Sequence, residues 1–152
     1  VIVGFPGETE SHVEKTYLFL VELPLSYLHV FSYSQRPGTA AVHLPRVVET
    51  KVRARRSEML RILSVKKRHQ FYRGFVGRTV EVLMEGTIEG GHRIGHTGQF
   101  ARVRVPGHSA RENEIVNVKI TSVEDQVCVG FVMAENEYRV AAPQGSLCGA
   151  VA

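Results

Sequence analysis

The residues best suited to chemistry lie directly after two short apolar runs near the beginning of the chain. Residues 1–3 run into the turn-forming segment 4–8, and the apolar segment 27–33 runs into Arg-Pro-Gly-Thr at residues 36–39. Parallel α/β folds place ligand loops at the carboxyl ends of their strands, although a plain turn would use the same residue types. If both strands are parallel neighbours, their loops open on one rim and form a single composite site.

A second candidate is the segment "FARVRV", which alternates as a half-buried strand does. The pattern predicts that Phe100, Arg102 and Arg104 face outward. An exposed aromatic ring between cations offers single-stranded RNA a stacking surface and charges for its phosphates. The alternative is that Phe100 packs under a loop and the arginines only keep the surface polar. The segment favours RNA binding.

The two cysteines, Cys128 and Cys148, predict neither a metal site nor a disulfide framework. They are too far apart for a Cys-x-x-Cys metal motif, and their small number is typical of a protein of the reducing cytoplasm. No apolar run is long enough to span a membrane. We therefore expect no metal ligands in this chain and no membrane partner.

The elements that must position the first site are a strand, a helix and a second strand. Thr9 or Ser11 is a suitable helix cap, with Ser11 and Glu14 at capping-box spacing, and Pro24 ends the helix. A long helix is expected next, over residues 46–72, beginning near Pro45. This order predicts a right-handed parallel crossover.

Charge is concentrated on the long helix and just beyond it. Residues 46–78 contain eleven Lys and Arg against two acidic residues, whereas the whole chain has a net charge of +4. Such a helix is often only a solvated face. With nucleic acid as partner, it would instead give an affinity that falls with salt.

From Arg73 onward the pattern changes to short alternating strands. "TVEVLM", "FARVRV", "IVNVKI" and "QVCVGFVM" are separated by glycine-rich or acidic turns. Four or five such strands predict a small all-β OB-like barrel. We therefore expect an α/β domain over residues 1–72, a barrel over 73–140 and a tail over 141–152.

Four motifs give the chain a family resemblance. "IVGFPGETE", "YLHVFSYSQRPGTAA", "RGFVGRTVEVLME" and "GHTGQFARVRVPG" occur in the order and spacing typical of the C-terminal half of radical S-adenosylmethionine methylthiotransferases. The last two resemble the TRAM domain, the RNA-binding barrel of those enzymes. The likeness extends to about residue 124. It implies part of a radical S-adenosylmethionine partial TIM barrel followed by a TRAM barrel.

The resemblance also implies cofactors. Enzymes of this family use S-adenosylmethionine and two 4Fe-4S clusters, and the Cys-x-x-x-Cys-x-x-Cys triad of the radical cluster is absent from this sequence. The chain is therefore expected to be inactive alone, as a fragment with no catalytic residue of its own. The positions expected to contact S-adenosylmethionine are Val3, Gly4, Phe5, Phe31 and Ser32.

The same resemblance implies tRNA, and not DNA, as the partner. Arg-Pro-Gly-Thr is typical of the family members that act on tRNA, which assigns Arg36, Pro37, Gly38 and Thr39 to substrate binding. The RNA-binding positions of the barrel are Arg78, His96, Phe100, Arg102 and Arg104. Family members often have Asn-Tyr where this chain has Gln-Phe at residues 99–100, so the chain lacks the tyrosine hydroxyl and keeps the stacking ring.

Two alternatives stay open on the sequence alone. "VFSYS" resembles the branch that methylthiolates threonylcarbamoyladenosine, with Ser32 in place of the usual proline, and the isopentenyladenosine branch is the alternative. A standalone tRNA-binding or RNA-binding TRAM protein is the second interpretation of the whole chain. Either way, a cytoplasmic protein is expected.

Overall fold

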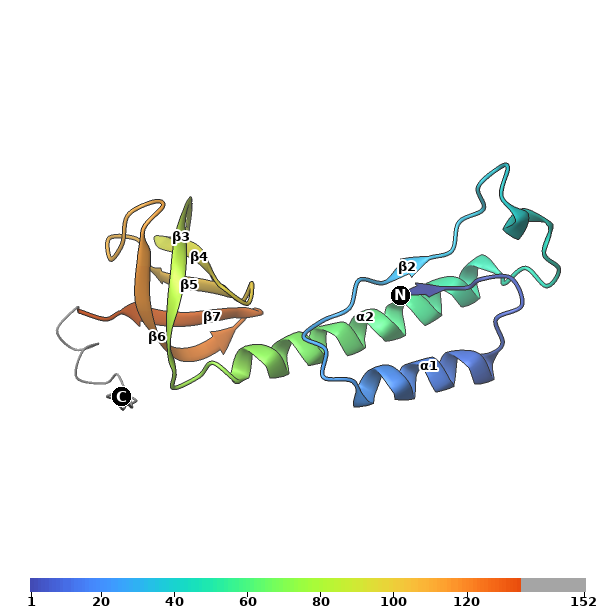
Figure 1. Cartoon of the computed structure of the whole chain (residues 1–152), viewed down its shortest axis with the longest axis horizontal. Helices are drawn as coiled ribbons and strands as arrows, with labels where there is room; N and C mark the ends of the chain where they lie inside the picture. The colour runs from blue at the N-terminus through green and yellow to red at the C-terminus, as the bar shows by residue number, and fades with distance from the viewer. Residues whose placement is uncertain (135–152) are drawn as a thin grey trace, which may run out of the picture. The chain divides into compact units, whose positions relative to one another are not determined.

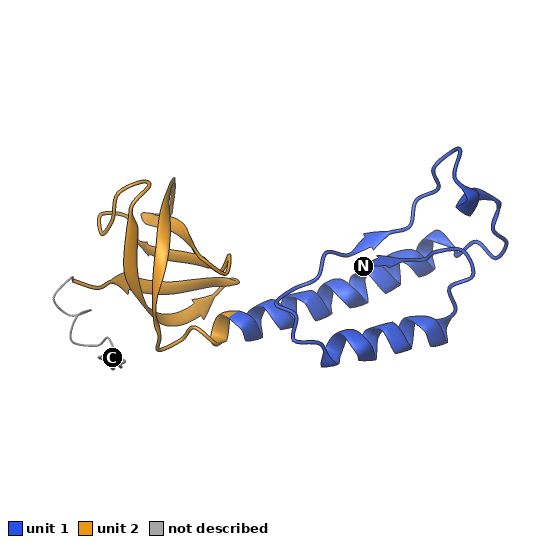
Figure 2. Cartoon of the chain, in the orientation of Figure 1, with its two compact units in different colours: residues 1–71 blue, residues 72–152 orange. Residues whose placement is uncertain are grey.

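The computed structural model describes residues 1–134 and divides the chain into two compact units, residues 1–71 and 72–152 (Figure 2). The expected tail over residues 141–152 and Cys148 lie outside the described residues, as does the end of the expected barrel domain beyond residue 134. No helix within residues 1–134 is long and apolar enough to cross a membrane.

The first unit contains a two-stranded parallel sheet and two long helices (Figure 1). Its elements in order are β1 (Ile2–Val3), α1 (Glu10–Glu22), β2 (Phe31–Ser32), the 3-10 helix η1 (Ala40–His43) and α2 (Thr50–Arg73). β1 pairs with β2 in parallel, Ile2 opposite Phe31 and Val3 opposite Ser32. The strand-helix-strand order and the parallel pairing are confirmed.

β2 is much shorter than the apolar segment 27–33 predicts. The backbone of Leu28 does not pair with a strand, because the hydroxyl of Ser64 donates to its carbonyl at 3.0 Å and accepts from its N–H at 2.8 Å. Ladder bonds begin further on, where Phe31 donates to Val1 and Tyr33 donates to Val3. A polar side chain of α2 thus satisfies the backbone where the strand was expected.

Helix α1 is capped by Thr9, one of the two predicted caps. The Thr9 hydroxyl accepts from the N–H of His12, and the His12 ring accepts from the N–H of Thr9, so the capping box joins these residues and not Ser11 with Glu14. The helix ends at Glu22, before Pro24, as predicted. Val13 and Leu20 are its buried residues.

Helix α2 begins at Thr50, so the predicted start at residue 46 is wrong. Arg46 has φ +61°, a left-handed conformation that a right-handed helix excludes. Its carbonyl accepts from the N–H of Gly7 at 2.9 Å, which ties the segment before α2 to the loop after β1. A tertiary hydrogen bond therefore replaces the first helical turn that Pro45 predicts.

The core of the first unit lies between the sheet and the two helices. Val3, Leu20, Leu60 and Leu63 are buried together there, and partly buried residues complete the cluster: Tyr17, Leu23, Leu28, Val30 and Met59. The sheet and both helices therefore share one apolar core.

The second unit is a closed five-stranded barrel (Figure 1). Its strands are β3 (Thr79–Glu89), β4 (His92–Thr97), β5 (Arg102–Pro106), β6 (Ile115–Glu124) and β7 (Val127–Val132), in the spatial order β3-β4-β5-β7-β6. β5 and β7 are parallel, and the other neighbours are antiparallel. The small all-β barrel is as predicted.

The barrel interior confirms the predicted alternation. Val82, Met84, Val103, Val105 and Val118 are fully buried, and they are inward positions of "TVEVLM", "FARVRV" and "IVNVKI". Each buried side chain of this size contributes roughly 1.5 to 3 kcal/mol relative to an exposed one. The barrel is therefore held chiefly by apolar burial.

Two glycines allow the strands to approach closely. A Cβ on Gly95 would lie 2.5 Å from the carbonyl oxygen of Leu83, and one on Gly130 would lie 2.4 Å from that of Lys119. Both contacts are with the backbone of the neighbouring strand, so no side-chain movement could relieve them. Because glycine takes an inward position in "HRIGHT", β4 lacks a clear alternating pattern.

Candidate functional site

A pocket of about 640 Å³ opens where β1 and β2 end, and we name it the strand-end pocket. This volume is within the range of small-molecule sites. The residues that line it are Ile2, Phe5, Phe31, Ser32, Tyr33, Ser34, Arg36, Thr39 and Ala41. They come from both strands and from the loops that follow them, as the shared rim of two parallel strands predicts.

The two loops meet through an aromatic contact. The rings of Phe5 and Tyr33 pack edge to face, with centroids 5.3 Å apart and planes at 73°. Phe31 is 60% exposed and Phe5 is 45% exposed, so both rings offer free surface to a ligand. The pocket thus combines an aromatic wall with the guanidinium of Arg36.

Not every residue assigned to this rim lines the pocket. Val3 is only 2% exposed and lies in the core. Gly4 is covered by α2, because a Cβ there would lie 2.1 Å from Cγ of Arg53. Pro37 and Gly38 do not line the pocket either, whereas the residues on both sides of them do.

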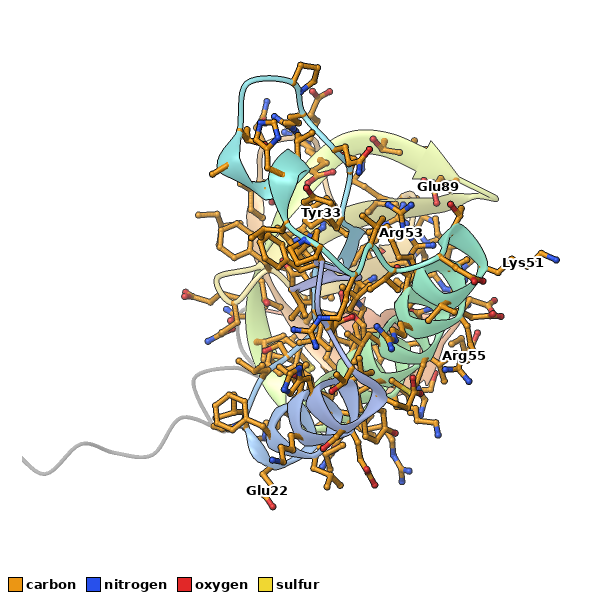
Figure 3. All side chains as sticks on the ribbon, turned by 90° about the vertical axis from the view of Figure 1, so that its right-hand side faces the viewer. Glu22, Tyr33, Lys51, Arg53, Arg55 and Glu89 are labelled. Carbon is orange, nitrogen blue, oxygen red and sulfur yellow. The ribbon has the colours of Figure 1, made fainter. Side chains whose placement is uncertain are left out.

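Helix α2 fixes the second loop from behind. The guanidinium of Arg53 donates to the carbonyl of Tyr33 at 2.7 Å, and the hydroxyls of Ser57 and Ser32 are 2.7 Å apart. Figure 3 shows Tyr33 and Arg53 close together, whereas Lys51 points away into solvent. One side of the basic helix therefore supports the pocket.

The first loop is fixed by an ion-pair cluster around the buried guanidinium of Arg56. Arg56 is 5% exposed and bonds to the carboxylates of Glu8 at 2.7 Å and Glu10 at 3.0 Å. The same Glu8 oxygen accepts from the N–H of Gly4 at 2.7 Å. Removing one member of such a buried cluster leaves an uncompensated charge. Arg56 is therefore a structural residue and is not available to nucleic acid.

The eleven cations of residues 46–78 fall into two groups. Five have contacts inside the first unit: Arg53, Arg55, Arg56, Lys67 and Arg68, the last over the ring of Tyr27 at 4.8 Å. Six are exposed and their side chains have no partner within residues 1–134: Arg46, Lys51, Arg61, Lys66, Arg73 and Arg78. Only this second group is free to neutralise phosphates.

Three of the side chains predicted to bind RNA on the barrel are paired with acids. His96 Nδ1 lies 2.6 Å from Glu85, Arg102 lies 2.7 Å from Glu89, and the Arg104 guanidinium bonds to Glu124. These are cross-strand pairs at the surface, each worth at most about 1 kcal/mol. A phosphate would have to compete with a carboxylate at all three positions.

Phe100 is 80% exposed, so the alternative that it packs under a loop is excluded. Its φ of +61° lies in the left-handed region, which is uncommon for an aromatic residue. Thr97 holds this turn, since its carbonyl accepts from the N–H of Phe100 and its hydroxyl accepts from the N–H of Ala101. The ring is held in solvent by a fixed backbone.

Phe100 forms one side of a groove of about 290 Å³, which we name the Phe100 groove. The residues that line it are Glu81, Leu83, His96, Thr97, Gly98, Phe100 and Ile115. Leu83 and Ile115 are 49% and 67% exposed. These two residues were not predicted from the sequence, although an apolar residue at an outward position of an alternating strand was the available signal.

Cys128 is fully buried, and burial raises the pKa of its thiol to about 11. The thiol is therefore protonated at neutral pH and is a poor metal ligand. No cluster of three or more His, Cys, Asp or Glu that could hold a metal ion occurs among residues 1–134.

Comparison with known proteins finds relatives along most of the chain, although no family model matches it. Threonylcarbamoyladenosine tRNA methylthiotransferase MtaB of Rickettsia prowazekii is 33% identical over 125 residues, 82% of this chain and 28% of that protein. The Bacillus subtilis protein of the same name is 36% identical, over 79% of this chain and 28% of its own length. tRNA-2-methylthio-N(6)-dimethylallyladenosine synthase of Agrobacterium fabrum is 34% identical, over 80% of this chain and 27% of its own length.

The fold and the sites define a protein with a parallel α/β unit, an aromatic pocket at its strand ends and a small β-barrel with an exposed aromatic groove. The comparisons are more specific. The chain is a relative of the tRNA methylthiotransferases, and the family resemblance seen in its motifs is confirmed. It spans under a third of the length of these relatives.

Proposed function

We propose that this chain is the substrate-recognising C-terminal part of a radical S-adenosylmethionine tRNA methylthiotransferase. The observation that supports this most is the strand-end pocket, in which two loops with family motifs meet around Phe5, Phe31 and Arg36. In this proposal the α/β unit is a portion of a partial TIM barrel and the second unit is a TRAM barrel. The protein works in the cytoplasm on tRNA, and neither DNA nor a membrane is involved.

The strand-end pocket suits S-adenosylmethionine in size and chemistry. Its aromatic rings offer stacking surface to an adenine, and the hydroxyl of Ser32 and the main chain of the loops offer hydrogen bonds. Of the five positions assigned to this cofactor, Phe5, Phe31 and Ser32 would contact it, while Val3 and Gly4 act indirectly by setting the course of the first loop. When bound, S-adenosylmethionine supplies the radical and the methyl group of the family's reaction.

The residues of this chain do not suit a 4Fe-4S cluster. Such clusters are held by cysteine thiolates, and the chain has two cysteines, of which Cys128 is buried with a protonated thiol. We therefore expect no methylthiotransferase activity from this chain alone. Its contribution is to bind and orient the substrate.

For the tRNA we assign different tasks to different residues. Arg36 and Thr39 line the pocket and are placed to meet the target nucleotide, with Pro37 and Gly38 shaping the loop between them. The six free cations near and on α2, Arg78 among them, are placed to bind phosphates. On the barrel, Phe100 stacks on a base, while His96, Arg102 and Arg104 contribute less because each has a carboxylate partner.

We propose threonylcarbamoyladenosine as the target nucleotide, on the basis of the "VFSYS" motif. Relatives named for this substrate and relatives named for dimethylallyladenosine match at similar identity, so the second branch is the competing assignment. The test compares binding of the full chain to one anticodon stem-loop that carries threonylcarbamoyladenosine, isopentenyladenosine or plain adenosine. Tighter binding of the threonylcarbamoyladenosine form supports the proposal. Tighter binding of the isopentenyladenosine form would assign the chain to the other branch.

Cofactor binding is tested separately by calorimetry with S-adenosylmethionine and the full chain. We expect binding that Phe31→Ala weakens by about tenfold, because the ring gives one wall of the pocket. Leu18→Ala is the matched control, since Leu18 is similarly exposed on α1 and does not line the pocket. Equal effects of the two variants on affinity would show that S-adenosylmethionine does not bind in this pocket.

A further inference from the structure

The Phe100 groove has the features of a site for one flat aromatic ligand. Phe100, Leu83 and Ile115 surround it with apolar side chains that are each about half exposed or more. The backbone of the Phe100 turn is fixed by the two hydrogen bonds that Thr97 accepts, so this backbone does not have to be ordered when a ligand binds. A positive φ at an exposed aromatic residue is strain of the kind that is retained at binding sites.

The acids of this barrel face differ in their partners. Glu85, Glu89 and Glu124 are each paired with one side chain, His96, Arg102 and Arg104 in that order. Glu81 lines the groove, is exposed, and its carboxylate has no hydrogen-bond or ion-pair partner within residues 1–134. The groove therefore offers one free acceptor group next to a stacking ring.

A free carboxylate beside an aromatic ring selects among the nucleobases by their edges. Guanine presents two adjacent N–H donors, N1–H and the N2 amine, which two carboxylate oxygens accept together. Adenine and cytosine present a single exocyclic amine beside an acceptor nitrogen. Uracil flanks its one N–H with two carbonyl oxygens, which a carboxylate repels.

We propose that the Phe100 groove binds one unpaired guanine base of RNA, with Phe100 stacking on the ring and Glu81 accepting from its N1–H and N2 amine. This inference rests on the proposed RNA binding by the chain and names the base that its barrel reads. The same carboxylate would repel the two carbonyl oxygens of uracil, so the site would combine an attractive and a repulsive element.

The test measures binding of the full chain to fluorescein-labelled uridine nonamers with one central guanosine, inosine or adenosine, at fixed salt, by fluorescence anisotropy. We expect guanosine to bind at least about fivefold more tightly than adenosine. Inosine should fall between them, because it keeps N1–H and lacks the N2 amine. Glu81→Gln should abolish the preference for guanosine, since the amide offers one acceptor oxygen and adds a donor.

Glu112→Gln is the matched control, because it removes the same charge from an exposed carboxylate of the same unit that does not line the groove. It should retain the guanosine preference, and equal thermal unfolding midpoints would show that both variants are folded. If the wild type binds all nonamers equally, or if Glu81→Gln keeps the preference, the guanine site is wrong while RNA binding stands. If the wild type binds no RNA, the proposed function fails as well.

Discussion

The two units of this protein use their cations in different ways. Residues 1–71 contain eleven Lys and Arg and six Asp and Glu, whereas residues 72–134 contain seven of each kind. In the first unit only Glu8 and Glu10 pair with cations, and Arg53 is bonded to the carbonyl of Tyr33, so several exposed cations have no partner within residues 1–134. On the barrel, the predicted RNA-binding side chains of His96, Arg102 and Arg104 each meet an acid, and Arg78 is the exception. Under the proposed function, we therefore expect long-range attraction of phosphate mainly from the first unit, and base contact from the second.

This difference shows that an outward position and a positive charge do not make a phosphate site. In alternating strands the neighbours across the sheet decide whether a cation is free, and those neighbours come from distant parts of the sequence. Arg104 and Glu124, for example, are on strands that are not consecutive. Four experiments test this difference between the two units.

The largest expected effect is on stability, from the buried arginine of the first unit. Arg56→Ala should lower the free energy of unfolding by about 3 to 5 kcal/mol, because it leaves Glu8 beside Gly4 without its cation. Chemical denaturation followed by circular dichroism measures this. Arg55→Ala is the control, since its pair with Glu10 is exposed and should be worth less than about 1 kcal/mol. Equal losses would contradict the assignment of Arg56 as a structural cation.

The second effect is on the salt dependence of tRNA binding. Replacing the free cations Arg61 and Lys66 by Ala should reduce the slope of log affinity against log salt by roughly 1.4 to 1.8, about 0.7 to 0.9 for each phosphate that is no longer neutralised. Replacing Arg102 and Arg104 by Ala removes the same charge but should reduce the slope by less than half as much, because both are paired. A larger reduction of the slope from replacing Arg102 and Arg104 would show that the barrel, and not the first unit, supplies the main phosphate contacts.

The third effect is on affinity without salt dependence. Phe100→Ala should weaken binding of single-stranded RNA by roughly 1 to 3 kcal/mol and leave the salt slope unchanged, since the ring stacks on a base and neutralises no phosphate. Titrations at three salt concentrations measure both quantities. Phe131→Ala, another exposed phenylalanine of the barrel that lies outside the groove, should change neither. An unchanged affinity of Phe100→Ala for RNA would show that Phe100 does not stack on a base.

The fourth effect is on the pH dependence of stability, from Cys128, and it is confined to alkaline pH. Its thiol pKa is raised to about 11 in the folded chain, so the unfolded chain loses this proton at lower pH than the folded chain. The stabilisation is complete below about pH 9 and is lost as pH rises from there to about 11, by roughly 1 kcal/mol per pH unit. Cys128→Ala should flatten this part of the curve. A curve as steep as that of the wild type would mean that the thiol is not the cause.

Local patterns predicted much of the fold. Alternation identified the buried faces of β3, β5 and β6, and apolar runs around a capped helix identified the parallel crossover and hence the meeting of two loops at the strand-end pocket. These features depend on periodicity and on strand direction, both of which are local. The pairing of "FARVRV" with its neighbours and the cross-strand acids are not local, and they were not predicted.

The errors have identifiable physical causes. The predicted start of α2 was too early because Arg46, whose carbonyl accepts a hydrogen bond from Gly7, has a left-handed backbone conformation. The predicted strand at β2 was too long because the Ser64 hydroxyl bonds to the backbone of Leu28. β4 was not recognised because Gly95 replaces an apolar residue where β3 comes close. In the first two cases a tertiary contact overrides a local preference, and the sequence around the affected residue shows no sign of it.

The central claim is that this chain recognises tRNA, through free cations of its first unit and a base-binding groove on its barrel. The most direct measurement is the dissociation constant of the full chain for an unmodified tRNA transcript, determined from low salt to above physiological salt. We predict tight binding at low salt and an affinity that falls steeply as salt increases. Absent binding, or an affinity that does not change with salt, would contradict the account.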